Sequence, residues 1–200
     1  GQRPPNASCP AGATATRQKQ FTQMTGLDTA AWFNVSQGTI IAECTPTCAT
    51  GQASVAGLCV AGSTGSFPTD AYYLQTNNSS NAANAFVKGN NVANNISTLT
   101  GVLTGRKTSL GMTYRNGIDV SCFAGPMATQ NSTVAMTNTA TGIVNLTVGC
   151  FAANSLHFNG WISKIIFFKK ALTLKKAAPF AIATRTGHTE RGIICGGQSN

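Results

Sequence analysis

The segment Trp-Ile-Ser-Lys-Ile-Ile-Phe-Phe, residues 161–168, has the composition of a buried β-strand. It combines β-branched and aromatic side chains, which favour strands, with a single charged residue. Successive side chains of a strand point to opposite faces of the sheet. Strict alternation therefore predicts one face with Trp161, Ser163, Ile165 and Phe167, and the other with Ile162, Lys164, Ile166 and Phe168. We expect this strand to be buried on most of both faces.

Other segments indicate further strands and a hairpin. Short apolar or alternating runs bounded by turn residues occur at 38–43, 54–60, 71–75 and 141–151. Asn116-Gly117 separates the runs 108–115 and 118–123. An Asn-Gly pair between such runs predicts a hairpin with a two-residue turn, because a type I′ turn needs positive φ at both central residues.

The sequence contains one helix candidate and one long polar loop. Thr173 is expected to cap a short helix that begins at Leu174, and Pro179 would remove a hydrogen bond beyond the first turn. Residues 77–84 are rich in Asn and are expected to form a loop, after which residues 85–87 open a short strand.

The composition is that of one all-β domain. The chain has 200 residues, 42% of them hydrophobic, so it can bury a core. Only 10% are charged, against about 25% in an average soluble protein. The polar residues are mainly Asn, Thr, Ser and Gly, which are poor inside helices and good in turns. This composition argues against disorder and against a coiled coil.

The five acidic residues give no sign of an enzyme. They are scattered along the chain: Asp28, Glu43, Asp70, Asp119 and Glu190. A retaining glycosidase needs two carboxyl groups about 5 Å apart, and no pair of acids here has a spacing that would bring two together on one strand. We interpret Glu43 as a surface residue at the end of a strand. The prediction is a non-enzymatic protein, with a glycoside hydrolase-like domain as a third alternative.

No metal or cofactor site is predicted. Asp70 with Asn77 and Asn78 would offer calcium only one carboxylate. The seven cysteines contain no Cys-x-x-Cys pair, so we expect free buried or partly paired thiols. A disulfide between Cys44 and Cys59 is possible if they lie on neighbouring antiparallel strands in an oxidising compartment.

Three blocks of the sequence resemble a known family. They are Trp-Phe-Asn with Ser-x-Gly-Thr-Ile-Ile-Ala-Glu within residues 32–43, Thr-Tyr-x-Asn-Gly-x-x-Val-Ser at 113–121, and Phe-Asn-Gly-Trp-Ile-Ser-Lys-Ile-Ile-Phe-Phe-Lys-Lys-Ala-Leu-Thr at 158–173. Their order and spacing are similar to those of concanavalin A-like (laminin G-like) jelly-roll domains of bacteriophage structural and tail proteins. The family usually continues the terminal helix with acidic residues and Gln, whereas this chain has Lys175, Lys176 and Pro179.

The resemblance implies an antiparallel β-sandwich with one short C-terminal helix. It would span residues 17–185, between an extended N-terminal arm at 1–16 and a C-terminal arm at 186–200. It also implies a place in a virion assembled in the host cytoplasm, as an adhesion or glycan-binding module on a tail fibre, spike or particle surface, used in host attachment. The alternative is a capsid decoration protein or minor structural subunit that binds the particle lattice through its arms.

The expected partners follow from the same family resemblance. They are other virion proteins, further copies of the chain in a homo-oligomer that could be a trimer, and a cell-surface glycan. No stretch reaches the roughly 18–20 apolar residues of a membrane span, so no membrane partner is predicted. No nucleic-acid partner is predicted either, because Phe167 and Phe168, beside the basic cluster, belong to a core-like strand and would not stack on bases.

Two groups of residues are candidate binding sites. Exposed aromatic rings flanked by amides suit a sugar, and the residues of this kind are Tyr72, Tyr73, Asn77, Asn78 and Asn81. Alternation lets only one of the two tyrosines face the core, and the other could simply cover a sheet face. A basic patch that could dock on an acidic protein consists of Lys164, Lys169, Lys170, Lys175 and Lys176.

Overall fold

The computed structural model describes residues 22–46, 52–60, 69–77, 82–89, 92–100, 107–124, 130–150, 158, 160–180 and 192–195. The strands are β1 (Thr22–Thr25), β2 (Gln37–Pro46), β3 (Gln52–Val60), β4 (Ala71–Asn77), β5 (Ala82–Gly89), β6 (Val92–Leu99), β7 (Thr108–Arg115), β8 (Asp119–Ala124), β9 (Gln130–Ala135), β10 (Ile143–Val148), β11 (Gly160–Phe168) and β12 (Gly192–Cys195). The helices are the 3-10 turn η1 (Leu27–Thr29), the short α-helix α1 (Leu174–Ala177) and the 3-10 turn η4 (Ala178–Phe180).

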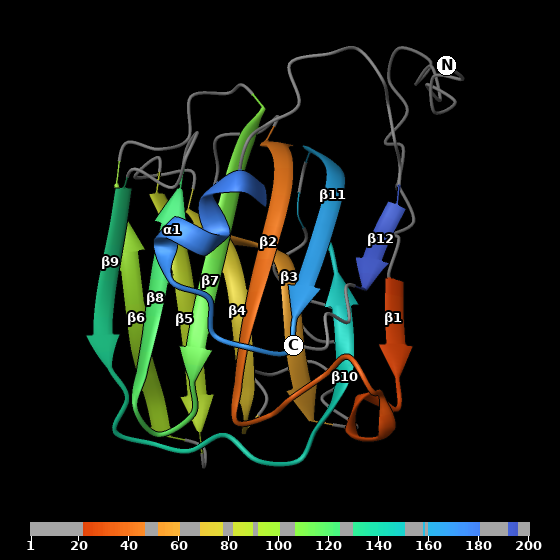
Figure 1. Ribbon diagram of the computed structural model, residues 1–200, viewed down its shortest axis with the longest axis vertical. Helices are drawn as coiled ribbons and strands as arrows, with labels where there is room; N and C mark the ends of the chain where they lie inside the picture. The colour runs from red at the N-terminus through yellow and green to blue at the C-terminus, as the bar shows by residue number, and fades with distance from the viewer. Residues whose placement is uncertain are drawn as a thin grey trace, which may run out of the picture.

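Within the described residues the strands form two six-stranded sheets that pack face to face (Figure 1). Sheet A has the order β1-β10-β3-β4-β5-β6, and sheet B has the order β12-β11-β2-β7-β8-β9. Neighbouring strands are antiparallel except β11 and β12, which are parallel. The predicted antiparallel β-sandwich with one short helix is therefore confirmed.

The core fills the space between the two sheets. It includes Ile40, Leu58, Leu110 and Leu146, each at most 1% exposed. Two stacked tyrosine rings connect the sheets: the centroids of Tyr72 on β4 and Tyr114 on β7 lie 4.1 Å apart. Trp32 and Phe33 pack against the border of this core, and the ring centroids of Trp32 and Phe167 lie 5.4 Å apart.

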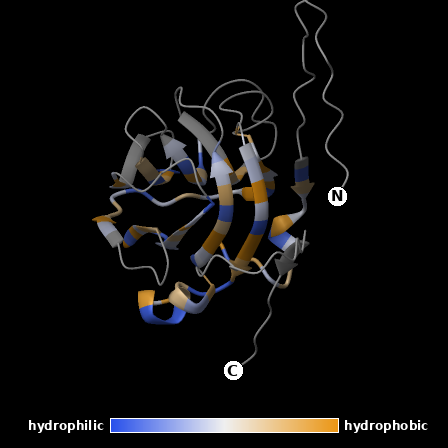
Figure 2. Ribbon diagram, turned by 90° about the horizontal axis from the view of Figure 1, so that it is seen from above, coloured by the Kyte–Doolittle hydropathy of each residue, from blue (hydrophilic) through white to orange (hydrophobic). Residues whose placement is uncertain are grey.

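The outer face of sheet B carries a second apolar cluster, covered by α1. Ile41, Phe123 and Ile166 lie there with Ala177 of the helix. Seen from above, α1 lies outside the two layers, and bands of hydrophobic and hydrophilic residues alternate along the central strands (Figure 2). The helix begins at the predicted residue, but the Thr173 side chain makes no capping hydrogen bond. The Thr173 carbonyl instead accepts hydrogen bonds from two backbone N–H groups of the helix.

Strand β11 departs from the predicted alternation at one point. Its register against β2 shifts between Ile162 and Lys164, so Ser163 is an extra residue, a β-bulge. Ile162, Ile165 and Phe167 pack into the core between the sheets, and Ile166 faces α1. The predicted faces are therefore wrong for Trp161 and Ile162, which precede the bulge, and right for the residues that follow it. The reason is that one extra residue in a strand reverses the faces of all side chains on one side of the bulge relative to strict alternation.

The hairpin and several connections differ in detail from the prediction. The loop between β7 and β8 contains three residues rather than two, with the Ile118 N–H donating to the Arg115 carbonyl and Gly117 at φ 72°. The predicted loop at 77–84 is shorter, because β5 already begins at Ala82. Strands β1, β6 and β9 were not predicted.

Part of the predicted C-terminal arm belongs to the sandwich. Residues 192–195 form β12, which pairs with β11 from Lys164↔Gly192 to Phe167↔Cys195. An apolar Gly-Ile-Ile-Cys segment can satisfy the unpaired backbone groups along the edge of β11. The N-terminal arm at 1–16 lies outside the described residues, and the boundaries at 17 and 185 stay predictions.

Candidate functional site

An exposed tryptophan stands on the outer face of sheet B, beyond the area covered by α1. Trp161 on β11 is 54% exposed, although tryptophan is among the most highly buried residues on average. Its neighbour across β2 is Thr45, and the following outward position of β2 is Glu43. Trp161 and Glu43 are therefore diagonal neighbours on one face, within reach of a large side chain. We call Trp161, Thr45, Glu43, Ser163 and Lys107 the Trp161 platform.

A polar network fixes the floor of the Trp161 platform. The Ser163 hydroxyl donates to Oε1 of Glu43 at 2.6 Å and lies 3.2 Å from the Glu43 carbonyl oxygen. The Lys107 ammonium forms an ion pair with the same carboxylate oxygen. The Glu43 side chain is 7% exposed, whereas that of Lys107 is 40% exposed. A buried carboxylate therefore holds a partly exposed lysine on the sheet face that carries the exposed Trp161.

The bulge in β11 makes this arrangement possible. In a regular strand Ser163 and Lys164 would point to opposite faces. The extra residue lets Ser163 reach Glu43 while Lys164 is also the register partner of Glu43 across the sheet. Bulges commonly re-aim a side chain in this way next to functional sites. The expectation that Glu43 is a surface residue at a strand end is wrong: β2 continues to Pro46, and Glu43 is buried and paired.

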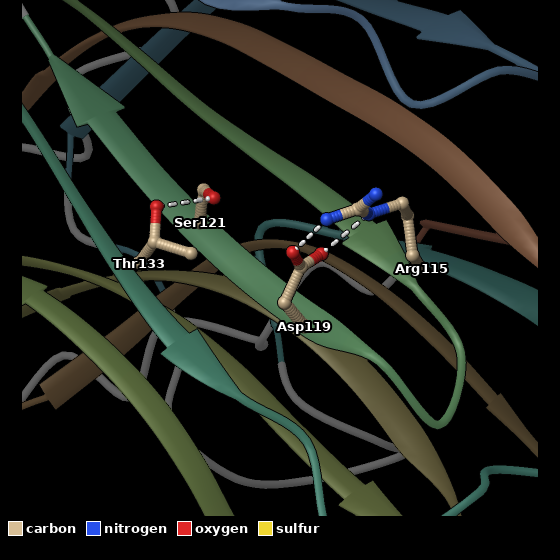
Figure 3. A network of polar contacts seen from close by, with 4 residues as sticks. All are labelled: Arg115, Asp119, Ser121 and Thr133. Atoms are coloured by element: carbon tan, nitrogen blue, oxygen red, sulfur yellow. Dashed lines mark hydrogen bonds and ion pairs between the residues drawn. The ribbon is translucent and has the colours of Figure 1, made fainter.

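The other edge of this outer face carries two further polar pairs (Figure 3). Arg115 and Asp119 flank the β7–β8 loop and form an exposed ion pair, and Ser121 and Thr133 join β8 to β9 with hydroxyl oxygens 2.8 Å apart. The bond to Asp119 raises the pKa of Arg115 further above its ordinary value. These side chains are engaged with one another.

The predicted glycan site around the two tyrosines does not have the required exposure. Tyr72 faces the core, and Tyr73 faces outward from sheet A, as alternation predicts, but both are fully buried. Tyr73 packs against Phe86 with the ring centroids 6.2 Å apart, so it covers a sheet face and offers no ring to a sugar. Only the backbone of Asn77 is described, and Asn78 and Asn81 lie outside the described residues.

The five lysines of the predicted basic patch are distributed over separate elements. Lys164 lies within β11, beside the Trp161 platform. Lys169 and Lys170 follow the end of β11, and Lys175 and Lys176 are exposed on α1. Of these, Lys164 is placed with the residues of the platform, and Lys169 lines a separate cleft.

The described residues hold no cluster typical of a metal site. Among them, no group of three His, Cys, Asp or Glu could bind a metal ion. Asp70 lies just before β4, whereas Asn77 ends that strand, so the two do not form a calcium site. Burial raises the pKa of the Cys44 and Cys122 thiols to about 12, with the Glu43 charge adding to the shift of Cys44. Both thiols are therefore protonated at neutral pH and are not nucleophiles.

The proposed Cys44–Cys59 disulfide does not form. Cys44 lies on β2 of sheet B and Cys59 on β3 of sheet A, and both are buried and belong to no disulfide. The two strands are consecutive in sequence but belong to different sheets. In the described part of the chain, no helix is long and apolar enough to span a membrane.

Comparisons with solved structures identify proteins of the same architecture. The CBM40 carbohydrate-binding module of a Ruminococcus gnavus IT-sialidase matches with a TM-score of 0.61 and 14% identity, over 74% of this chain and 84% of that one. The native heptameric SAP-like pentraxin from Limulus polyphemus matches with a TM-score of 0.55 and 12% identity, over 74% of this chain and 70% of that one. A leech intramolecular trans-sialidase matches with a TM-score of 0.60 and 16% identity, over 84% of this chain but 28% of that one.

The chain has a jelly-roll β-sandwich fold. No protein-family model and no curated protein matches the sequence. At these identities the likeness establishes the fold alone, since one fold supports many functions. The Ruminococcus gnavus module has also been solved with α2,3-sialyllactose bound. Sequence reasoning missed the Trp161 platform because it assigned Trp161 to a buried strand, and Lys107 and Glu43 are far apart in sequence.

Proposed function

We propose that the chain is a non-enzymatic glycan-binding module whose ligand binds on the Trp161 platform. The observation that carries the proposal is an indole 54% exposed on an open sheet face beside the Glu43–Lys107–Ser163 network. An exposed tryptophan combines a large apolar surface with an N–H donor. Its ring can stack on the apolar face of a sugar, and the side chains beside it can bond to the sugar hydroxyls.

The network reduces the cost of binding because its side chains are already held in place. A free lysine loses rotamer freedom when it binds a ligand, about 0.5–1.5 kcal/mol for each such side chain. The Lys107 ammonium is positioned by Glu43 before any ligand arrives, and Glu43 is positioned by Ser163. The platform is therefore preorganised for a polar ligand that contacts the indole.

The charges of the platform favour an acidic glycan. Lys107 neutralises Glu43, and Lys164 adds a second positive charge as the register partner of Glu43. The whole chain also carries a formal net charge of +9. The sialyllactose complexes of the structurally similar CBM40 support sialylated glycans as the first ligands to test.

The test is calorimetric titration of the purified chain with α2,3-sialyllactose, α2,6-sialyllactose and lactose. We expect a sialylated ligand to bind, lactose to bind more weakly, and Trp161→Ala to abolish measurable binding. Ile118→Ala is the matched control because Ile118 is 57% exposed on the β7–β8 loop, away from the platform. A wider glycan screen without any binder, or equal binding by the W161A and I118A variants, would reject the proposal.

The distribution of carboxylates supports a binding role over hydrolysis. Among the described residues, Glu43 is paired with Lys107, Asp119 with Arg115, and Asp70 accepts a backbone hydrogen bond from Thr141. A glycosidase would need two carboxyl groups facing each other across the substrate. The platform contains one, and that one is buried in an ion pair. Release of reducing sugar from a bound oligosaccharide would contradict this part of the proposal.

We also propose that the module is part of a bacteriophage particle, carried as an adhesion module on a fibre, spike or particle surface. The three sequence blocks at 32–43, 113–121 and 158–173 support this placement. A trimer in sedimentation velocity together with glycan binding would favour the adhesion role. Binding to empty capsids without any glycan affinity would favour the alternative of a capsid decoration protein or minor structural subunit.

A further inference from the structure

A cleft of about 670 Å³ opens at the end of the sandwich where β2 and β10 begin. Its lining comes from three segments: the chain before β2, the start of β10, and the residue after β11. Figure 1 shows these segments together at the lower end of the molecule, at the opposite end of β11 from Trp161. The volume lies within the range of about 300–1,000 Å³ typical of small-molecule sites.

The first wall of the cleft is held from inside the core. The Tyr114 hydroxyl donates to the Asn34 carbonyl at 2.8 Å, and the Tyr72 hydroxyl donates to the Val35 carbonyl at 3.3 Å. These are the two stacked core tyrosines, one from each sheet. The Asn34 side chain also accepts the Ser36 N–H at 2.9 Å. The loop is therefore fixed at consecutive residues by buried groups.

The second wall is fixed in the same way by different residues. The Asn116 side chain donates to the Ala140 carbonyl at 2.7 Å and accepts the Ala140 N–H at 2.9 Å. One carboxylate oxygen of Asp70 accepts the Thr141 N–H at 2.9 Å. Gly142, with φ 63°, then turns the chain into β10. The cleft is consequently preformed on both sides.

The third side is set by Thr39 of β2. Its hydroxyl donates to the Lys170 carbonyl and accepts the Leu172 N–H, both at 2.9 Å. These two bonds hold the backbone that follows β11, and this backbone carries Lys169 at the rim of the cleft. The position of Lys169 is therefore determined at its backbone, while its side chain stays exposed.

The lining combines two opposite charges with an apolar floor. Asp28 and Lys169 are both exposed, and within the described residues neither forms an ion pair with the other or with a third group. The same cleft is also lined by the apolar residues Phe33, Ile143 and Val144, which we call its floor. A ligand with a single charge would satisfy one rim residue and leave the other with water alone.

The geometry points to a binding site for a small zwitterion that carries an ammonium group, an anionic group and an apolar body, such as a free amino acid with a large side chain. The ammonium group would face Asp28, the anionic group would face Lys169, and the apolar body would cover the floor. The same pair of charges occurs in a phosphoethanolamine headgroup. This site is separate from the Trp161 platform and does not depend on glycan binding.

The test is protein-observed NMR with the ¹⁵N-labelled chain, following the amides of Gly142 and Val144. The probes are L-phenylalanine, O-phosphoethanolamine, N-acetyl-L-phenylalanine, which has no ammonium group, and L-phenylalaninamide, which has no carboxylate. We expect L-phenylalanine to shift both amides and each single-charge analogue to bind about tenfold more weakly, the loss typical of one charge-assisted contact. Stronger binding by O-phosphoethanolamine would support the same charge pattern with a headgroup as its source.

Three variants distinguish binding in the cleft from a nonspecific effect of changing the charge of the protein. Asp28→Asn and Lys169→Gln should each weaken the zwitterion by about tenfold. Lys170→Gln, an exposed neighbour that does not line the cleft, should leave binding unchanged, as should W161A. The inference is overturned if neither zwitterion moves the two amides, if the single-charge analogues bind equally well, or if K170Q weakens binding as much as K169Q.

Discussion

Removing the Lys107 ammonium should destabilise the fold, because it deletes the positive charge that forms an ion pair with the buried Glu43 carboxylate. The substitution is Lys107→Met, which keeps the length of the side chain and deletes the charge. Glu43 would retain the Ser163 hydroxyl, 2.6 Å from its Oε1 atom, as a hydrogen-bond donor. This hydroxyl carries no charge, so it does not replace the opposite charge that a group only 7% exposed has lost.

The expected loss in the free energy of unfolding depends on how exposed Glu43 and Lys107 are. Breaking a fully buried ion pair costs about 3–5 kcal/mol, and an exposed pair contributes about 0–1 kcal/mol. Glu43 is buried, but the Lys107 side chain is 40% exposed, so water screens the pair in part. We therefore expect a loss of about 2 kcal/mol, which corresponds to a fall in Tm of about 4–8 °C for a domain of this size.

The assay is urea unfolding, with two further variants. With a slope of about 2 kcal/mol per molar, the midpoint of K107M should fall by about 1 M. Adding Glu43→Gln should restore most of the stability, because a neutral amide needs no counter-charge and still accepts the Ser163 hydrogen bond. Arg115→Met is the matched control: the Arg115–Asp119 pair is exposed, and its loss should leave the midpoint nearly unchanged.

Two results would refute this reasoning. One is a K107M midpoint no lower than that of R115M, which would mean that Glu43 does not depend on Lys107. The other is a double variant, E43Q/K107M, that is no more stable than K107M alone, which would mean that the buried carboxylate is not the source of the loss. Either result would also contradict the claim that the Glu43–Lys107–Ser163 network holds the Trp161 platform in place.

Three further predictions concern buried side chains. Tyr114→Phe should cost about 1 kcal/mol in urea unfolding, and Tyr72→Phe should cost less, because the hydroxyl bond of Tyr114 is 2.8 Å long and that of Tyr72 is 3.3 Å; equal costs would contradict the geometry. Burial raises the pKa of Cys44 and Cys122 to about 12 from an ordinary value of 9.0, so the folded state holds their protons more tightly, and the stability that they contribute should be lost between pH 9 and pH 12. The double variant C44A/C122A should show a smaller fall in Tm over that range, and an identical fall would count against the burial of these thiols. Ile166→Ala, 4% exposed beneath α1, should cost about 2–5 kcal/mol, and a loss below 1 kcal/mol would mean that the helix does not cover this residue.

The architecture could be predicted from the sequence because its strongest signals are local. The apolar run at 161–168, the alternation at 143–148 and the Asn116-Gly117 loop each depend on residues that are close together in the chain. The sequence pattern does not predict strand β6, Val-Ala-Asn-Asn-Ile-Ser-Thr-Leu, because its asparagines favour turns. Its strand conformation depends on pairing with β5, which a local pattern does not reveal.

The site was harder to predict because it depends on contacts between distant segments. One extra residue at Ser163 reverses the face that Trp161 occupies, and no residue type in that segment marks a bulge. The ion-pair partner of Glu43 is Lys107, which lies just before β7 and has no fixed spacing from Glu43. Tyr73 has the predicted orientation but is buried, because the cover of an outer sheet face is a property of the whole fold.

The central claim, that a glycan binds on the Trp161 platform, is tested most directly by the two tryptophan indole N–H signals. The chain contains two tryptophans: Trp161 is exposed, and Trp32 packs against the core. In a ¹⁵N–¹H NMR titration with α2,3-sialyllactose, the account predicts that the Trp161 indole signal shifts with saturation while the Trp32 signal stays in place. A glycan that binds without moving the Trp161 signal, or that moves the Trp32 signal alone, would contradict it.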